Sequence, residues 1–133
     1  MMSDSKRERG IARFNEVYCN DLPQPPAEGE DRFFDFMLGS LFGDLWDNST
    51  LSIRERRLLL LGAIAAQGED MTFTIQAQSA YKRGELSEAQ LEEAVLFLTQ
   101  YIGYPRASKM RMALMGLMPK LKKAEAEAKA NGG

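Results

Sequence analysis

The side chains that could do chemistry in this chain are few and of limited kinds. The 133 residues contain no histidine and a single cysteine, Cys19. A Ser-His-Asp triad, a histidine metal site and an internal disulfide all lack the residues they need. The candidates that remain are arginine, glutamine and tyrosine side chains, with aromatic rings beside them, and we expect neither a metal nor a cofactor.

Two arginines are candidates for binding an anion. Arg57 stands directly before the apolar run of residues 58–66, and a guanidinium can bind a carboxylate through two parallel hydrogen bonds. Arg106 follows Pro105 at the expected start of a helix, where backbone N–H groups favour anions. In the structural alternative, Arg106 is solvated and Arg57 pairs with an internal acid. The candidate acids are Glu30, Asp31 and Asp35.

Gln76 and Tyr101 are the candidate catalytic residues. The Gln76 amide can donate a hydrogen bond to a carbonyl or lactone oxygen, and the Tyr101 hydroxyl can donate a proton. Trp46, Phe97 and Tyr104 are candidates for lining a ligand pocket. The alternative for the aromatic residues is packing in the core, because aromatic side chains at helical spacing commonly do so. For Gln76 the alternative is a hydrogen-bonded polar residue on a helix.

Helical periodicity runs through almost the whole chain and predicts an all-α fold of about six helices. No stretch alternates apolar and polar residues as a strand would. Residues 20–31 contain three prolines and are expected to form a stiff connector. The residues from 58 to 66 are apolar all round, which is typical of a helix at the centre of a domain or an assembly. The expected helices cover residues 5–19, 33–46, 53–67, 71–83, 88–102 and 105–118.

Start and stop signals support these boundaries. Two helices begin with a capping box, in which a serine and a Glu or Gln three residues later satisfy each other's backbone N–H groups. Pro119 is expected to interrupt or restart the last helix. The charged tail of residues 120–133 is expected to begin with a solvated, fraying Ala-, Glu- and Lys-rich helix over residues 120–130 and to finish with a disordered end. The two boxes are Ser52 with Glu55 and Ser87 with Gln90.

Composition excludes several classes of protein. There are 17 Lys and Arg residues against 19 Asp and Glu residues, and a net charge of −2 argues against a nucleic-acid binder. The longest apolar run, residues 58–66, is far shorter than the roughly 20 residues of a membrane span. Residues 1–9 are polar and predict no signal peptide. We expect one domain over residues 1–133, with its core at about 7–117, in the reducing cytoplasm.

Four short segments, in this order and at this spacing, resemble the carboxymuconolactone decarboxylase family. They are residues 9–18 (RGIARFNEVY), 41–46 (LFGDLW), 51–56 (LSIRER) and 101–105 (YIGYP). The resemblance implies an alkylhydroperoxidase-D-like, all-α protomer with a helical hairpin at its centre. It also implies a ring-shaped homotrimer or homohexamer, which the apolar surface of so small a chain independently favours.

The resemblance also implies two kinds of activity. One is decarboxylation of 4-carboxymuconolactone, and the other, in the alkylhydroperoxidase-D branch, is disulfide reduction in a peroxidase system. That branch's glutamate falls at Arg57, its cysteines at Glu69 and Thr72, and its histidine at Gln76. Thiol chemistry requires a thiolate, so we expect no thiol peroxidase. Histidines of the decarboxylase branch would fall at Gln76 and Phe97, so an acid–base step there cannot run unchanged.

Two functions remain open at this point. The first is a lyase that acts on a small carboxylated lactone or ring compound in aromatic catabolism. Arg57 and Arg106 would hold the anion, and Tyr101 or Gln76 would assist proton transfer. The second is a non-catalytic ligand-binding or assembly protein of the same fold. In both, the partners are a small anionic molecule and further copies of the chain, and the pocket is expected between the helix that begins at Ile53 and that of Gln76.

Overall fold

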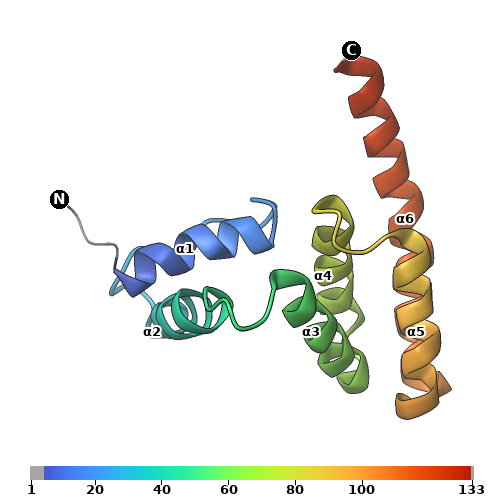
Figure 1. The fold of residues 1–133 in the computed structure, drawn as a ribbon, viewed down its shortest axis with the longest axis horizontal. Helices are drawn as coiled ribbons and strands as arrows, with labels where there is room; N and C mark the ends of the chain where they lie inside the picture. The colour runs from blue at the N-terminus through green and yellow to red at the C-terminus, as the bar shows by residue number, and fades with distance from the viewer. Residues whose placement is uncertain (1–4, 133) are drawn as a thin grey trace. The chain divides into compact units, whose positions relative to one another are not determined.

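The computed structural model describes residues 5–132, which form helices joined by loops (Figure 1). The all-α class is confirmed. Residues 1–4 of the expected domain and Gly133 of the expected tail lie outside the described residues. The elements are α1 (Lys6–Val17), α2 (Arg32–Phe36), the π-helix η1 (Met37–Trp46), α3 (Ile53–Gln67), α4 (Asp70–Lys82), α5 (Glu88–Ile102) and α6 (Tyr104–Asn131).

The chain forms two compact units that meet in sequence between Arg56 and Arg57. The first unit contains α1, α2 and η1, and the second contains α4, α5, α6 and all but the first turn of α3. Every residue of the expected site except Trp46 belongs to the second unit. That residues 1–133 make a single domain stays a prediction.

In the first unit, α1 and η1 pack so closely that their backbones touch. A Cβ atom added to Gly10 would lie 1.7 Å from the carbonyl oxygen of Leu38, and one added to Gly43 would lie 2.1 Å from that of Lys6. Neither distance is possible for a real side chain. Glycine at these two positions is therefore what allows the helices to approach.

The segment expected to be one α-helix over residues 33–46 is helical, but only its start is α. From Met37 onward the helix has the wider π geometry, with hydrogen bonds from residue i to i+5. In these wider turns, residues four apart lie on nearly the same face of the helix. The buried side chains follow that spacing, since Leu38, Phe42 and Trp46 are 0%, 2% and 6% exposed. The rings of Phe42 and Trp46 stack with 5.8 Å between centroids, and Phe14 of α1 meets Phe42 edge-on at 5.3 Å.

The connector between α1 and α2 is held by polar contacts from both flanking helices. Arg7 of α1 donates from Nη2 to the carbonyl oxygen of Pro26 at 2.7 Å and from Nε to Asp35 Oδ1 at 3.0 Å. The other oxygen of Asp35 accepts from the backbone N–H of Gly29 at 3.0 Å. These bonds fix a loop whose prolines already limit its freedom.

In the second unit, α3, α4, α5 and α6 share one apolar core. Both predicted capping boxes form. The backbone N–H of Ser52 donates to Glu55 at 2.8 Å and lowers the pKa of that carboxyl below its ordinary value. The Ser87 hydroxyl accepts from the backbone N–H of Gln90 at 3.1 Å. The core residues are Leu61, Ile64, Ala65, Phe73, Ala77, Ala80, Leu86, Leu91, Val95, Met110, Leu114, Leu117 and Met118.

The apolar run of α3 is buried on one face only within the single chain. Leu61 and Ile64 lie in the core, at 1% and 8% exposed, whereas Leu59 on the other face is 65% exposed. Of the expectation that this helix lies at the centre of a domain or an assembly, the single chain shows the domain part for the face that carries Leu61 and Ile64. The other face is an apolar surface that the single chain leaves open.

Helix α6 continues through Pro119 to Asn131, so the expected interruption is wrong. A proline inside a helix removes one hydrogen bond and typically costs about 3 kcal/mol. Contacts to the rest of the second unit hold the helix beyond it: Lys122 Nζ bonds Glu88 Oε1 at 2.9 Å, and the Tyr81 hydroxyl donates to Glu125 at 3.0 Å. No helix among residues 5–132, α6 included, combines the length and the apolar character needed to cross a bilayer.

Candidate functional site

The candidate site is built around Arg57, which is completely buried. It occupies the second turn of α3, directly before the apolar run. Its Nε donates to Glu85 Oε1 at 2.9 Å and its Nη2 to Glu85 Oε2 at 3.2 Å, so the two groups form a bidentate pair. Its Nη1 donates to Gln76 Oε1 at 2.7 Å. A buried guanidinium needs such partners, because an uncompensated buried charge is strongly unfavourable.

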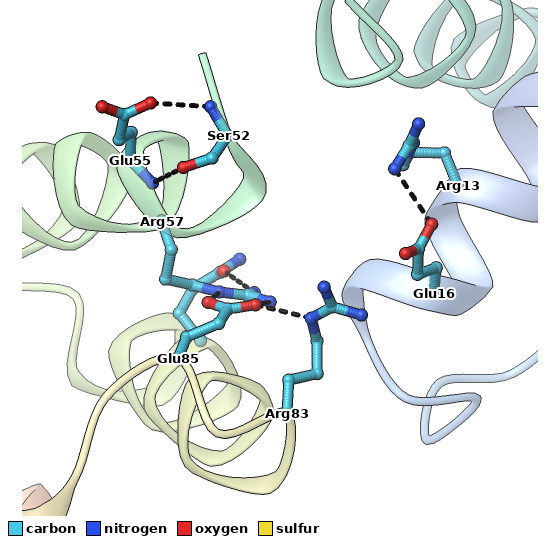
Figure 2. A network of polar contacts seen from close by, with 8 residues as sticks. Arg13, Glu16, Ser52, Glu55, Arg57, Arg83 and Glu85 are labelled. Carbon is cyan, nitrogen blue, oxygen red and sulfur yellow. Dashed lines mark hydrogen bonds and ion pairs between the residues drawn. The ribbon is translucent and has the colours of Figure 1, made fainter. Parts of the chain in front are cut away.

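Glu85 supplies the carboxylate of this pair from the loop between α4 and α5 (Figure 2). The loop turns at Gly84, whose φ of +73° suits glycine. The backbone N–H of Glu85 donates to the carbonyl oxygen of Ala80 at 2.9 Å, which fixes the residue at the end of α4. Glu85 Oε2 also accepts from Arg83 Nε at 2.6 Å. One carboxylate, 6% exposed, therefore lies between two guanidinium groups.

Gln76 lies in the middle of α4 and is 2% exposed. Its side-chain oxygen is committed to Arg57. The structure therefore brings together Arg57 and Gln76, as expected, and adds Glu85, which the sequence analysis did not name. Glu85 lies in a loop outside any helical pattern; the signal that could have found it is an acid directly after the glycine that ends α4.

The electrostatics of the cluster are those of a satisfied ion pair. Arginine stays protonated at any pH at which proteins fold, and a glutamine amide does not titrate. Neither side chain can therefore exchange a proton with a ligand. The bidentate pair with Glu85 also occupies the guanidinium edge that a ligand carboxylate would use. Arg57 thus follows the structural alternative, with Glu85 as the internal acid.

The other candidates in the second unit lie at its surface. Phe97 and Tyr101 are 60% and 78% exposed on α5, with ring centroids 5.4 Å apart. Arg106 is exposed in the first turn of α6, where its aliphatic carbons pass Gly68. Tyr104 is 68% exposed and lines a pocket between α5 and α6. The structure therefore does not bring these four side chains into the buried cluster.

Two further residues considered for chemistry have plain structural places. Trp46 belongs to the aromatic cluster of the first unit, where it stacks on Phe42. Glu69, which falls at a cysteine position of the alkylhydroperoxidase-D motif, is exposed in the turn before α4. Among residues 5–132, no group of three or more acidic or thiol side chains gathers in a way that could hold a metal ion.

Comparison with known proteins identifies the family of the chain. The sequence model of the carboxymuconolactone decarboxylase family matches residues 31–115, which is more than half of the chain. The chain belongs to the carboxymuconolactone decarboxylase family. Neither the curated proteins nor the solved structures gave a match.

In the resemblance drawn from the sequence, Arg57 and Gln76 stand where the alkylhydroperoxidase-D motif has its glutamate and its histidine. The family match covers Arg57, Gln76 and Glu85 alike. In this chain Arg57 binds Gln76, and it also binds the carboxylate of Glu85 in the loop between α4 and α5. Family membership is therefore established, while the chemistry of the individual member has to be argued from these contacts.

Proposed function

We propose that this protein is a ligand-binding member of the carboxymuconolactone decarboxylase family whose helical core does no catalysis. The observation that carries the proposal is the closed cluster of Arg57, Gln76 and Glu85, in which every group named is bound to another. A catalytic centre needs a group that gains or loses a proton or electron pair at the reacting atom. The Arg57 guanidinium and the Gln76 amide have neither property.

The cysteine and histidine content of the chain also supports the proposal. With one cysteine and no histidine in the chain, the protein has no internal dithiol to cycle and no imidazole to relay a proton. A thiol peroxidase mechanism is therefore closed to a single copy. The single cysteine also supports a reducing compartment, and we propose the cytoplasm.

The lyase that the family resemblance implies is the competing function. It would have to use the exposed hydroxyls of Tyr101 or Tyr104, because these are the uncommitted proton donors among the candidates named above. A general acid accelerates a reaction only when it is held within hydrogen-bond reach of the reacting atom, and these exposed side chains are surrounded by water. Binding of a small carboxylated molecule without turnover is the simpler function for this chain.

A paired assay tests the proposal. Purified protein is given 4-carboxymuconolactone, and loss of substrate is followed beside a decarboxylase of the same family as a positive control. A second assay supplies an organic hydroperoxide with a dithiol reductant. We expect no rate above the buffer blank in either. Turnover of the lactone that survived purification and disappeared in Tyr101→Phe or Tyr104→Phe would overturn the proposal in favour of the lyase.

Ligand binding is tested separately by thermal unfolding with a panel of small carboxylic acids and lactones. A ligand that binds only the folded state raises the melting temperature by mass action. We expect at least one acid of the panel to raise it, and the matching neutral amide to do so less. If no compound of the panel changes the melting temperature, the proposed ligand binding is refuted, and assembly is left as the function of the fold.

A further inference from the structure

A pocket lies between α5 and α6, on the side of the second unit that the buried cluster does not use. Its volume is about 410 Å³, within the range that holds small organic ligands. Each helix contributes four residues spaced i, i+3, i+4 and i+7, which is one helix face. The lining residues are Glu92, Val95, Leu96 and Thr99 from α5, and Tyr104, Ala107, Ser108 and Arg111 from α6.

The hollow arises because the middle of both faces carries short side chains. Val95, Thr99 and Ala107 form a buried floor, at 5%, 7% and 2% exposed. The two helices are joined at Gly103, whose φ of +91° permits the tight turn between them.

The polar groups of the pocket differ in what they offer a ligand: the guanidinium only donates hydrogen bonds, the hydroxyls donate or accept, and the carboxylate only accepts. Arg111, Ser108 and Tyr104 bring a guanidinium and two hydroxyls, whereas Glu92 brings one carboxylate. The Thr99 hydroxyl already donates to the carbonyl oxygen of Val95 at 2.7 Å. A guanidinium and two hydroxyls that can all donate, beside an apolar floor, suit a ligand that is itself apolar with an acceptor-rich, negatively charged end.

Arg111 is held far more loosely than Arg57. In the described part of the chain it makes one ion pair, from Nη1 to Glu92 Oε2 at 3.3 Å, and the two side chains are 53% and 48% exposed. Exposed pairs of this kind contribute roughly 0–1 kcal/mol. A ligand carboxylate can therefore take Arg111 from Glu92, whereas it cannot take Arg57 from a buried bidentate partner.

We propose that this pocket binds a small carboxylate whose body is one or two apolar rings, with Arg111 holding the carboxylate. The rings lie on Val95 and Ala107, and Tyr104 closes one end. The inference rests on the proposed function, because it assumes that the protein binds such a molecule. At 3.6 residues per turn, Phe97 and Tyr101 fall on the opposite face of α5, so assembly through that face leaves the pocket open.

Titration calorimetry with sodium 2-naphthoate tests the proposal, with neutral 2-naphthamide as the matched control ligand. We expect the naphthoate to bind, the amide to bind at least tenfold more weakly, and added salt to weaken the naphthoate alone. Chemical-shift changes in isotope-labelled protein should centre on the pocket residues. No binding of either compound, or shifts confined to other helices, would overturn the assignment.

Two charge variants distinguish an anion site from a cation site. Arg111→Gln should weaken naphthoate binding about tenfold, since a charge-assisted bond is lost. Glu92→Gln should tighten it a few-fold, because Arg111 then has no competing carboxylate. Lys123→Gln, farther along the same helix, removes one positive charge outside the pocket and should change binding less than twofold. The reverse order of the first two variants would rule out the anion site.

Ser108→Leu fills the pocket from its exposed side without disturbing the buried floor. Leucine is a better helix former than serine, so this variant should fold, which its helical circular dichroism and melting temperature will verify. We expect it to abolish naphthoate binding. Full binding in the folded variant would show that the acid binds elsewhere, which refutes the pocket but leaves the proposed function standing. Lactone turnover by the wild type would refute the proposed function and leave the pocket standing.

Discussion

A fully buried arginine places strict demands on the residues around it. Arg57 meets them with a bidentate carboxylate and an amide oxygen, so the cluster holds a charge in a low-dielectric interior without an unpaired group. Removing Arg57 takes the bidentate partner away from the Glu85 carboxylate, which then keeps its contact with the partly exposed Arg83, and removing Glu85 takes the carboxylate away from a fully buried guanidinium. The consequences of single substitutions here should therefore exceed those of ordinary surface ion pairs.

Arg57→Met should destabilise the folded protein by about 3–5 kcal/mol, because Glu85 loses its buried partner. Urea unfolding followed by circular dichroism measures the change. Arg83→Gln is the control, since Arg83 contacts the same carboxylate from a position whose side chain is 25% exposed, and we expect a much smaller loss.

The double variant Arg57→Met with Glu85→Leu should recover a large part of that loss, because well-packed apolar residues can replace a buried ion pair. The coupling free energy from the double-mutant cycle isolates the pair. If Arg57→Met alone unfolds at the same urea concentration as the wild type, the structural role of Arg57 is contradicted.

Alkaline pH should weaken the contacts that hold the end of α6. The hydrogen bond to Glu125 raises the pKa of Tyr81 above its ordinary value of 10.0, and the bond to Glu88 raises that of Lys122 above 10.5. A pKa raised by folding means that the protonated form is stabilised. The contribution is therefore full below about pH 10 and is lost as the pH rises through the folded-state values.

Tyrosinate absorbance during an alkaline titration measures the effect at Tyr81. The difference between the wild type and Tyr81→Phe isolates this residue from the other three tyrosines. Glu125→Gln should bring its pKa back toward the ordinary value, whereas Lys123→Gln should not. An unchanged titration in Glu125→Gln would show that the hydrogen bond does not hold in solution.

At the level of single residues, the sequence singled out Arg57 and Gln76 as candidates but not Glu85. Helical periodicity says which residues share a face, and a loop residue has no such pattern. The partner of a buried charge is chosen by tertiary geometry, here by the turn at Gly84 that carries Glu85 back toward α3.

Among the elements, the helix pair α1 and η1 is the most sensitive to a single added methyl group. Gly10→Ala should destabilise the first unit by about 3 kcal/mol or more, because the new Cβ would overlap a backbone oxygen that has no rotamer to move away. Gly39→Ala is the matched control on η1. Nothing lies within 4 Å of its Cβ position, and alanine favours a helix over glycine.

Chemical denaturation of the two glycine variants, compared with the wild type, measures the difference. We expect Gly39→Ala to be neutral or stabilised by up to about 1 kcal/mol. Equal stability of the Gly10 and Gly39 variants would mean that α1 and η1 do not approach as closely in solution as in the structure.

Local signals predicted most element boundaries. Helix α3 begins and ends where the capping serine and the following glycine indicated, and both capping boxes form. The π geometry of η1 was missed because apolar residues every four positions also fit an α-helix. The effect of Pro119 was misjudged because the sequence shows only the hydrogen bond that a proline removes from a helix. It does not show the tertiary contacts of Tyr81 and Lys122, which hold the helix beyond the proline.

For the whole molecule, the apolar surface left by the single chain is the main feature. Monomeric proteins rarely leave large contiguous apolar patches exposed, and several large side chains of both units are more than half exposed. We therefore expect a homotrimer or homohexamer. The side chains are Phe33, Phe36, Leu45, Leu59, Met71, Phe97, Tyr101, Met112 and Met115, together with Leu96 and Tyr104, which line the pocket between α5 and α6 and are not part of the surface expected to be covered.

Light scattering at micromolar concentration should give three or six times the chain mass of 14.9 kDa. The variant Phe97→Glu with Tyr101→Glu places two charges on the exposed face of α5 and should shift the mass toward that of one chain, if this face takes part. Ser108→Leu, on the other side of the helix, should leave the mass unchanged. A wild type that scatters as a monomer would refute the expected assembly.

The place of Trp46 gives the protein a built-in optical reporter. It is the chain's single tryptophan, and it stacks on Phe42 inside the first unit. Tryptophan fluorescence therefore follows that unit alone, while Tyr81, Tyr101 and Tyr104 lie in the second. Comparing fluorescence with helical circular dichroism during unfolding tells whether the two halves lose structure together, because coincident curves are the mark of one cooperative transition. No label has to be introduced to ask the question.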